Sequence, residues 1–363
     1  MREQSGVSLA DLTTLHLGGP ARRLLIATSE AEVVETVRAA DAAGEPLLVL
    51  GGGSNVVVAD DGFDGIVLQV ATTGVETGPE PHTLQVAAGV DWDHLVALSV
   101  EQGMSGLEAL SGIPGRVGAA PIQNVGAYGQ EVAAVVRDLR VLDRRSGDVV
   151  TLPAAGCGFG YRDSVFKRSP RYVVLAVSLA LGHDPLGAAV RYAELARALG
   201  VEVGDPAPPR DVRRAVLALR RRKGMLLEPP PPAALLARPA HDTLDHDAHD
   251  HDTWSAGSFF TNPVLPEAAA AGLPPEAPRW PSADGRVKTS AAWLIEQAGF
   301  GKGYGRGHDP RARVSTKHTL ALTNTGGATT VELLDLAREI RAGVAARFAV
   351  TLEIEPVLVG VTL

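Results

Sequence analysis

The sequence predicts an α+β protein of several domains, and three observations along its 363 residues lead to that fold class. Residues 24–75 alternate helix and strand signals, and a second stretch from about 84 to 183 does the same. From 187 to 223 the sequence becomes helix-rich. The chain is 45% hydrophobic and 21% charged, as globular proteins commonly are, and it is long enough for two or three domains with buried cores.

The first stretch begins with helix signals and continues with three strands. Ser29 followed by Glu32 has the spacing of a capping box, and the valines at 33, 34 and 37 then form one apolar stripe of a helix. The next segment, PLLVLGGGSNVVVADDGFDGIVLQV, predicts strand, glycine turn, strand, turn and strand in that order.

The second stretch contains a helix, a glycine-rich segment and two further strands. The helix is predicted in DWDHLVALSVEQG (91–103), and the strands near 139–143 and 172–181. The apolar run VVLAVSLAL (Val173 to Leu181) is far shorter than the roughly 20 residues that cross a bilayer, so we expect a buried strand.

The remaining segments predict three helices and a last strand. Two helices are expected in VRYAELARAL and DVRRAVLALRRRK, and a third follows the capping box of Thr329 and Glu332. The apolar face of that third helix is formed by Leu333, Leu336, Ile340, Val344 and Phe348. The final segment, VTLEIEPVLVGVTL (350–363), predicts a strand.

Between these regions, Leu227 to Thr253 carries a proline run and then a tract of His and Asp residues. Its histidines are His241, His246, His249 and His251. Imidazole and carboxylate both bind metal ions, so a metal site is one interpretation. A low-complexity acidic tract cannot bury a core, however, and we favour a solvated, disordered insertion over 228–253 that holds no metal.

Composition excludes several classes of protein. The segment MREQSGVSLADLTTLHLGG lacks the apolar core of a signal peptide. Cys157 is the only cysteine, which excludes an internal disulfide framework and favours a reducing compartment. The net charge of −8 argues against a nucleic-acid partner. We therefore expect a cytoplasmic protein, without a membrane partner, that acts on a small molecule.

The segment GGGSNVVV (Gly51 to Val58) is not a dinucleotide fingerprint of the Rossmann type. That fingerprint must open a helix whose N-terminus meets the pyrophosphate, whereas three β-branched valines follow here and predict a strand. Consecutive backbone N–H groups of this turn could form an anion nest. A plain β-turn is the alternative.

The second glycine segment is GLEALSGIPGRVGAAPIQNVGAYGQE (Gly106 to Glu131). Its many small residues would let the backbone lie flat against a planar ligand, with Gln123, Asn124 and Tyr128 as polar contacts. A glycine-rich loop that packs only on itself is the alternative, which explains the polar residues poorly.

The segment WSAGSFFTNP (Trp254 to Pro263) places one hydroxyl between a glycine and two phenylalanines. Gly257 lets the backbone before Ser258 approach a ligand closely, and Asn262-Pro263 ends the segment as a turn. The alternative is that Ser258 serves only as a turn hydroxyl.

These motifs, taken in order, resemble those of MurB-type UDP-N-acetylenolpyruvoylglucosamine reductases. They are GGGSN, then GLE-x-L-x-GIPG-x-VG-x-x-P-x-QN-x-GAYG-x-E about sixty residues later, then GYRDSVFK, AGSFFTNP and LEIEPVLVG. The resemblance covers nearly the whole chain. It implies an FAD enzyme that uses NADPH to reduce the enolpyruvyl ether of UDP-N-acetylglucosamine, giving UDP-N-acetylmuramate for peptidoglycan.

The resemblance also implies a domain arrangement. It is a two-subdomain FAD-binding fold of the vanillyl-alcohol-oxidase type, followed by a C-terminal α/β substrate domain. The implied domains are 1–75 and 76–186 for FAD, 187–349 for substrate, and 350–363 as the strand that carries an active-site Glu. We expect a monomer. We also expect FAD to be bound noncovalently, because the sole cysteine, which could tether a flavin, lies outside both glycine segments.

The resemblance assigns two sets of residues. The residues assigned to FAD are Gly51, Gly52, Gly53, Ser54, Asn55, Gly115, Gly118, Ala119, Gln123, Asn124, Gly126, Ala127, Tyr128 and Gly129. Those assigned to the substrate are Tyr192, from the lid of one subgroup of the family, together with Lys223, Asn262, Lys302 and His318.

Three catalytic roles follow from the resemblance. Ser258 is the proton donor to the enolate carbon, Arg162 grips the enolpyruvyl carboxylate, and Glu355 acts near the enolate as a protonated acid. Without the family, Arg162 beside Asp163 would be a surface pair. The family usually reads E-V-R where this chain has Glu355-Pro356-Val357. In a strand Glu353 would face the same side as Glu355, so spacing does not choose between them.

Two other functions remain open from the residues themselves. One is an oxidase or dehydrogenase that acts on a sugar or alcohol with the same flavin fold. The other is a flavin-binding or metal-buffering protein without catalytic activity. The joint presence of the three predicted catalytic residues favours the reductase.

Overall fold

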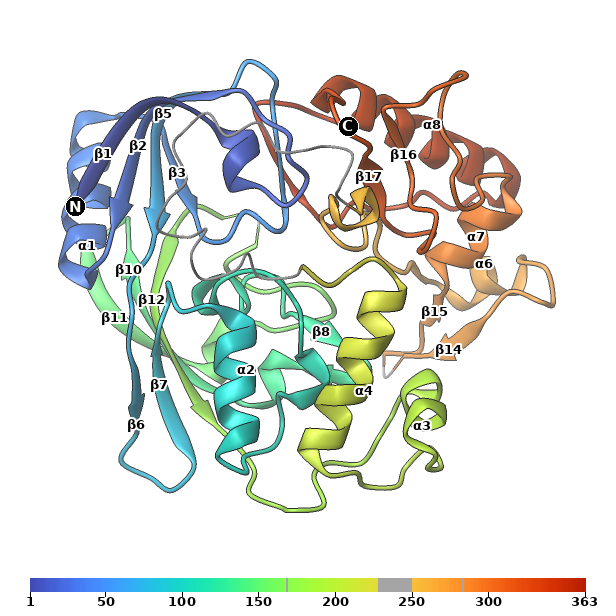
Figure 1. The fold of residues 1–363 in the computed structure, drawn as a ribbon, viewed down its shortest axis with the longest axis horizontal. Helices are drawn as coiled ribbons and strands as arrows, with labels where there is room; N and C mark the ends of the chain where they lie inside the picture. Colours follow the sequence, from blue (N-terminus) through green and yellow to red (C-terminus); the bar gives the residue numbers. More distant parts are fainter. Residues whose placement is uncertain (168, 228–249, 283) are drawn as a thin grey trace. The chain divides into compact units, whose positions relative to one another are not determined.

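The computed structural model describes residues 1–167, 169–227, 250–282 and 284–363, and the chain forms two compact units (Figure 1). The first unit comprises Met1–Ser8, Pro20–Gly53 and Phe63–Arg221, and the second Leu9–Gly19, Ser54–Gly62 and Arg222–Leu363. Each unit contains helices and sheets around a core of its own, which is the predicted α+β class. The finer division of the chain into domains stays a prediction.

The first sheet of the first unit has strand order β1–β2–β5–β3. Its strands are β1 (Arg2–Ser8), β2 (Pro20–Ala27), β3 (Leu47–Leu50) and β5 (Phe63–Val70). The helix α1 (Glu30–Ala43) lies between β2 and β3 in the sequence. Ser29 caps α1 as predicted, accepting the N–H of Glu32. The Glu32 carboxylate accepts the N–H of Thr28 at 2.7 Å, so the reciprocal half of the predicted capping box falls one residue earlier.

The second sheet of this unit is antiparallel, with strand order β11–β10–β12–β7–β6. Its strands are β6 (Val75–Thr77), β7 (Thr83–Ala87), β10 (Val136–Asp143), β11 (Asp148–Pro153) and β12 (Tyr172–Ala180). The apolar run predicted to be a buried strand is β12, the central strand. The predicted helix is also confirmed, as α2 (Trp92–Glu101), which Asp91 caps.

One continuous apolar core joins both sheets of the first unit. It contains side chains of α1 and β5 together with those of α2, β10 and β12. A smaller cluster lies under α3 (Ala193–Leu199) and α4 (Pro209–Arg222), the two helices predicted from 190 onward. A short hairpin, β8 (Gly126–Ala127) and β9 (Gln130–Glu131), turns through Tyr128 and Gly129, both of which have positive φ.

The second unit is built around α8 (Thr330–Phe348), which begins at the predicted and complete capping box. Its shorter helices are α6 (Glu267–Ala271) and α7 (Ala291–Gln297). Among the described residues of this unit, the strands form three small sheets. They are β13 (Val264–Leu265), β15 (Val287–Thr289) and β14 (Arg279–Pro281); β16 (Ala312–Val314) and β17 (Leu322–Asn324); and β18 (Val357–Val359) and β4 (Val56–Val58). Leu333, Leu336, Ile340 and Val344 are buried and Phe348 is partly buried against the same core, which confirms the predicted apolar face of α8.

The described residues also contain short 3-10 turns. They are Leu9–Leu12, Glu108–Leu110, Val117–Ala119, Val132–Ala134, Ala154–Cys157 and His251–Thr253. Within the part of the chain that the structure describes, no helix is both long and apolar enough to cross a membrane.

Two expectations differ from the structure. The predicted last strand shrinks to β18, since Pro356 offers no backbone donor to a ladder and the partner strand β4 has three residues. Residues 228–249 of the predicted insertion lie outside the described residues. Its end at 250–253 is not disordered, because Asp250 caps the 3-10 turn His251–Thr253 there.

Candidate functional site

The two glycine segments meet inside the first unit. A Cβ atom on Gly52 would lie 2.8 Å from the Cα of Gly115, and one on Gly51 would lie 3.6 Å from the Cβ of Ala119. The first distance is shorter than any real side chain tolerates, so Gly52 must lack a side chain. Segments about sixty residues apart thus form one backbone surface, which the plain-turn interpretation of GGGSN does not explain.

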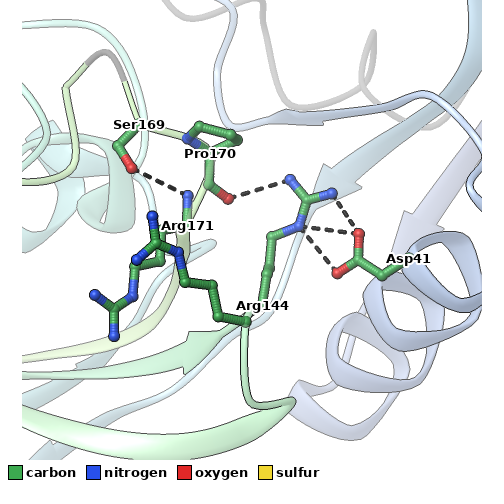
Figure 2. Close-up of a pocket in the computed structure, with 6 residues that line it drawn as sticks. Asp41, Arg144, Ser169, Pro170 and Arg171 are labelled. Carbon is green, nitrogen blue, oxygen red and sulfur yellow. Dashed lines mark hydrogen bonds and ion pairs between the residues drawn. The ribbon is translucent and has the colours of Figure 1, made fainter.

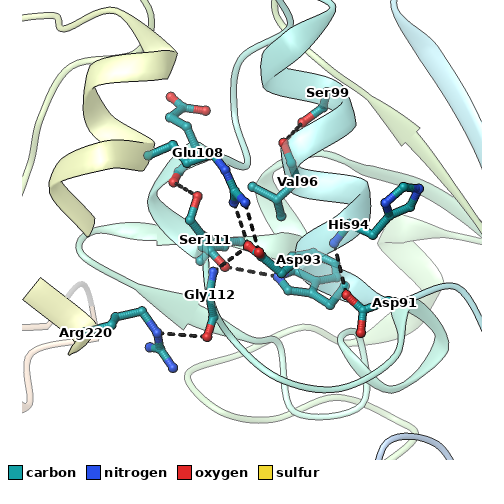
Figure 3. Close-up of polar contacts among 12 residues, drawn as sticks. Asp91, Asp93, His94, Val96, Ser99, Glu108, Ser111, Gly112 and Arg220 are labelled. Carbon is teal, nitrogen blue, oxygen red and sulfur yellow. Dashed lines mark hydrogen bonds and ion pairs between the residues drawn. The ribbon is translucent and has the colours of Figure 1, made fainter. Parts of the chain in front are cut away.

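A charged clamp holds the start of the second glycine segment (Figure 3). The Asp93 carboxylate, at the start of α2, accepts the N–H of Gly112 at 2.6 Å and two hydrogen bonds from Arg213 of α4. The buried Arg220, two turns further along α4, donates from Nε to the Gly112 carbonyl at 3.0 Å. Both backbone polar groups of Gly112 are therefore fixed by ionised side chains.

The charges of this clamp are matched to one another. Burial by itself would raise the pKa of Asp93, but the Arg213 guanidinium and the Gly112 N–H hold it below its usual value. Burial lowers the pKa of the Arg220 guanidinium. Asp93 stays ionised because Arg213 balances its charge.

Other glycines of the second segment have packing roles. A Cβ on Gly118 would lie 2.5 Å from the Cβ of Ala88, and Gly118 donates its N–H to the Ala88 carbonyl at 2.8 Å. A Cβ on Gly126 would lie 2.8 Å from Nη1 of Arg162, and one on Gly129 would lie 2.8 Å from the Cβ of Arg191. These positions need glycine for fold as well as for any ligand.

The polar residues predicted to contact FAD lie in the same segment but differ in their surroundings. Asn124 is 1% exposed and its amide is engaged with other parts of the protein. Gln123 and Tyr128 are half-buried. The ring of Tyr128 stands edge-on to that of Tyr192, the predicted lid residue, at 5.6 Å between centroids.

Ser54 and Asn55 belong to the second unit, where they precede β4. The Asn55 amide donates to the carbonyl of Glu355 at 3.4 Å, and the Asn55 carbonyl accepts the N–H of Val357 at 3.0 Å. This pairing continues into the parallel β4–β18 ladder. The end of the first glycine segment therefore lies beside the predicted catalytic Glu355.

Ser258 sits on a loop whose following residues are firmly held. Phe259 donates its N–H to the Leu320 carbonyl at 2.7 Å and accepts the N–H of Glu355 at 2.9 Å. Phe259 and Phe260 are each 1% exposed and pack at 5.3 Å between ring centroids. Gly257 has φ +71°, a left-handed conformation that suits glycine. The half-buried Ser258 hydroxyl is thus presented from an anchored backbone.

The structure separates Glu355 from Glu353. Glu355 is half-buried, whereas Glu353 is exposed. The backbone of Glu355 pairs with Phe259, directly after Ser258, while the carbonyl of Glu353 pairs with the N–H of Thr261. Glu355 is therefore the acid whose surroundings better suit a role beside Ser258.

Arg162 lies in the first unit on a tight turn and has φ +54°. Its Nη1 donates to the Asn124 carbonyl at 3.3 Å, and its Nη2 donates to the Gly126 carbonyl. Its side chain is 19% exposed, so it is not the surface pair with Asp163 that its sequence neighbours would suggest. Among the described non-glycine residues with positive φ, half are Asn124, Tyr128 and Arg162, and such strain concentrates at functional sites.

The predicted substrate residues fall in different places. Tyr192 is 45% exposed in the first unit; partial burial and the nearby Glu194 carboxylate raise the pKa of its phenol. Lys223 is half-buried and Lys302 exposed. The Asn262 amide oxygen accepts the N–H of Ala291, the first residue of α7, at 2.9 Å.

His318 is joined to the Ser258 loop through the backbone. Its Nδ1 accepts the N–H of Leu320 at 3.1 Å, and the Leu320 carbonyl accepts the N–H of Phe259. A neutral imidazole whose Nδ1 accepts carries its proton on Nε2. His318 would thus meet a ligand as a hydrogen-bond donor.

Sequence reasoning missed Asp252, at the end of the His/Asp tract. Its carboxylate, 4% exposed, accepts the N–H of Thr316 at 2.8 Å and the Thr316 hydroxyl, and Lys317 lies 3.9 Å away. Burial would raise the pKa of Asp252, but these bonds and the Lys317 charge hold it below its usual value. The tract was interpreted from its overall composition, which does not distinguish one buried structural carboxylate from its solvated neighbours.

The clamp residues Asp93, Arg213 and Arg220 were missed as well. A signal for two of them was present, since Arg213 and Arg220 are seven residues apart and share a helix face with the buried Val216. Charged residues on the same helix face as buried apolar residues indicate a buried partner of opposite charge or a buried hydrogen-bond acceptor.

Two surface cavities lie elsewhere. One of about 380 Å³ in the first unit is lined by Asp41, Arg144, Arg145, Ser169, Pro170 and Arg171 (Figure 2). Another of about 740 Å³ in the second unit lies at the end of α8, beside Trp293 and Phe348. Neither is lined by a predicted site residue. In the first, Arg144 pairs with Asp41 and Arg171 with Asp143, as in ordinary structural ion pairs.

Within the described ranges, no group of three or more His, Cys, Asp or Glu side chains is placed to hold a metal ion. His241, His246 and His249 lie outside those ranges, so the structure does not test whether the tract binds a metal ion.

Comparisons with known proteins agree with the resemblance. A model of the FAD binding domain matches residues 21–153, and a model of the C-terminal domain of UDP-N-acetylenolpyruvoylglucosamine reductase matches 248–359. The chain is 53% identical to UDP-N-acetylenolpyruvoylglucosamine reductase of Streptomyces coelicolor, over 100% of this chain and 92% of the relative. It is 54% identical to that of Thermobifida fusca, over 98% of both.

A solved structure agrees at the level of the fold. The crystal structure of UDP-N-acetylenolpyruvylglucosamine reductase (MurB) from Thermus caldophilus has a TM-score of 0.64 to this chain at 27% identity, and the match covers 99% of each chain. The predicted FAD-binding fold followed by a C-terminal substrate domain is confirmed.

Proposed function

This chain belongs to the UDP-N-acetylenolpyruvoylglucosamine reductase family, and we infer that it catalyses the reaction of that family. The reaction is the NADPH-dependent reduction of UDP-N-acetyl-3-O-(1-carboxyvinyl)-glucosamine to UDP-N-acetylmuramate, a peptidoglycan precursor, with FAD as cofactor. The observation that carries this function is the identity of about one half over the full length of both chains.

The residues of the chain fit FAD. Gly52 packs backbone against backbone on Gly115, so the two glycine segments are joined into one surface. The turn at Gly51–Gly53 lies against the turn at Gly115. Successive backbone N–H groups of such a glycine turn can form an anion nest. We propose that these two turns and the segment up to Gly129 hold the cofactor.

When bound, FAD supplies the transfer of hydride from NADPH to the substrate double bond. The residues of the chain must then stabilise the negative charge that develops on the substrate and deliver a proton to it. Reduction of an enolpyruvyl group places negative charge next to the carboxylate of the substrate, and one carbon must receive a proton.

Ser258 is the proposed proton donor to that carbon. A hydroxyl is a poor acid in water, but it becomes effective when it is held against a strongly basic carbanion. The anchored Phe259 and Phe260 that follow Ser258 supply this fixed position, and Gly257 removes the side chain that would crowd the substrate.

Arg162 and Glu355 have complementary proposed roles. A guanidinium can hold a carboxylate through two parallel hydrogen bonds and offset charge that builds on the enolate. Two carbonyl groups orient the Arg162 guanidinium. Glu355, as a protonated acid, would donate to the same charge, since a bare carboxylate would oppose the reaction.

We also propose that the protein works as a cytoplasmic monomer on this small-molecule substrate, with Tyr192, Lys223, Asn262, Lys302 and His318 as substrate contacts. The single cysteine supports a reducing compartment. Size-exclusion chromatography with light scattering measures the oligomeric state directly.

An anaerobic titration tests the function. NADPH should bleach the visible absorbance of the purified protein, and the enolpyruvyl nucleotide should restore it, with UDP-N-acetylmuramate as the only new nucleotide in the mass spectrum. Bleaching without restoration would sink the reductase assignment.

A further inference from the structure

We propose that Asn124 and Glu131 are positioning residues for Arg162, a role that rests on the proposed function of Arg162. The side chain of Asn124 was expected to contact FAD. In the structure its amide connects the turn that carries Arg162 to the hairpin that the Arg162 guanidinium contacts. All three residues lie in the first unit.

The turn that carries Arg162 needs support. Gly160 and Asp163 exchange backbone hydrogen bonds at 3.0 and 3.3 Å, and the tight connection between them forces Arg162 to φ +54°. An L-residue loses free energy in this left-handed conformation. Contacts outside the turn must therefore hold it in place.

The Asn124 amide supplies these contacts. One N–H of its NH2 group donates to the Gly160 carbonyl at 2.9 Å, and the other donates to Oε2 of Glu131 at 2.9 Å. Its oxygen accepts the N–H of Ala133 at 3.0 Å. The opposite orientation of the amide would face donor with donor, so the network fixes this one.

Glu131 completes the arrangement. It belongs to β9, which pairs with β8 through Gly126 and Glu131. Nη2 of Arg162 donates to the Gly126 carbonyl, and Oε1 of Glu131 lies 4.0 Å from Nη1. One carboxylate thus accepts from Asn124 with one oxygen and faces the guanidinium with the other. The turn, the hairpin and the guanidinium form one network centred on a buried amide.

This network predicts how the side chains act. Asn124 and Glu131 set the backbone and the direction of Arg162 and need not touch the substrate. An oxygen acceptor at 131 matters more than its charge, because the contact at 2.9 Å is to Asn124, whereas the guanidinium is 4.0 Å away. Gln at 131 keeps such an acceptor, and Ala does not.

The test compares Glu131→Ala with Glu131→Gln in anaerobic stopped-flow. Glu131→Ala should slow the restoration of flavin absorbance by the enolpyruvyl nucleotide about tenfold or more, since small misplacements of a positioned group are costly. Bleaching by NADPH should stay near the normal rate, and Glu131→Gln should restore most of the loss. Equal slowing of both phases, or none in either, would overturn the inference.

A double-mutant cycle shows whether Glu131 acts through Arg162. In an Arg162→Lys background, Glu131→Ala should add little further slowing. The guanidinium that Glu131 positions, with its paired N–H donors, is already absent there. Fully additive slowing would mean that Glu131 acts independently, and positioning would be wrong.

A measurement without turnover separates this inference from the proposed function. Amide hydrogen exchange at Asp163 should accelerate in Asn124→Ser and Glu131→Ala, and it should return toward normal in Glu131→Gln. If Asn124→Ser does not fold, the two Glu131 variants decide. Failure of the unmodified protein to reduce the nucleotide would sink the function alone, whereas unchanged exchange in Glu131→Ala would sink the positioning network.

Discussion

Glu355 donates its backbone N–H to the carbonyl of Phe259 at 2.9 Å, and this bond joins two motifs that lie about a hundred residues apart in the sequence. Phe259 directly follows Ser258, and an isolated bridge between Phe260 and Ile354 extends the pairing. The proposed acid and the proposed proton donor are therefore carried by neighbouring backbone segments of the second unit. Each segment sets the position of the other.

This pairing predicts different outcomes for two adjacent glutamates. Glu355→Gln should lower kcat by about 10² or more, as the loss of a positioned acid commonly does. Glu353→Gln is the matched control and should stay within a few-fold, because Glu353 is exposed. Steady-state kinetics on both variants checks this. A larger loss in Glu353→Gln would exchange the two assignments.

The protein should hold FAD without a covalent bond. The sole cysteine, Cys157, is buried, and burial raises the pKa of its thiol to about 11, so little thiolate exists to form a tether. Acid precipitation should leave the yellow colour in the supernatant. Colour in the pellet would contradict the prediction.

The clamp on Gly112 should be needed for stability and for flavin retention. Asp93→Ala removes the acceptor of the Gly112 N–H and leaves Arg213 unpaired, which should cost about 1–3 kcal/mol of unfolding free energy. Arg214→Ala is the control on the same helix, since its pair with Asp211 is exposed. Denaturant titrations and the rate of flavin release measure both. Equal effects would show that the clamp contributes nothing specific.

The stability that Asp252 contributes should depend on pH. Its pKa is lowered in the folded protein, so its contribution is present above the unfolded value of about 4 and is lost as the pH falls through the lower folded value. Asp252→Asn should melt a few degrees below the unmodified protein at pH 7, and the difference should shrink below about pH 4. The exposed Asp309→Asn serves as control. A constant difference down to pH 3 would refute the linkage.

Local patterns predicted most helices and strands because their signals are local. The stripe of α1, the apolar run of β12 and the capping box of α8 each lie within one element. The last strand failed for a reason that was visible in the sequence. Pro356 interrupts it, because proline has no backbone N–H to donate to a strand ladder.

Contacts between distant residues were not predictable from local patterns. The bond between Asn55 and Glu355 spans 300 positions, and the burial of Asp252 depends on Thr316. Asn124 was predicted from its place in a motif, but its type alone could not tell a ligand contact from a buried hub. Such roles depend on packing, which only the folded chain defines.

The central claim is that Ser258 delivers the proton, and Ser258→Ala in anaerobic stopped-flow tests it most directly. Bleaching by NADPH should keep its normal rate, because that phase needs no proton at the substrate. Restoration of absorbance by the enolpyruvyl nucleotide should slow by about 10² to 10⁴, the usual contribution of a positioned general acid. Thr261→Ala, three residues later in the same segment, is the control and should leave the ratio of the two rates unchanged, because the Thr261 hydroxyl makes a long contact of 3.4 Å to the Glu353 carbonyl. Equal slowing of both phases in Ser258→Ala would mean that the hydroxyl supports the fold or the flavin, and the proton-donor role would be wrong.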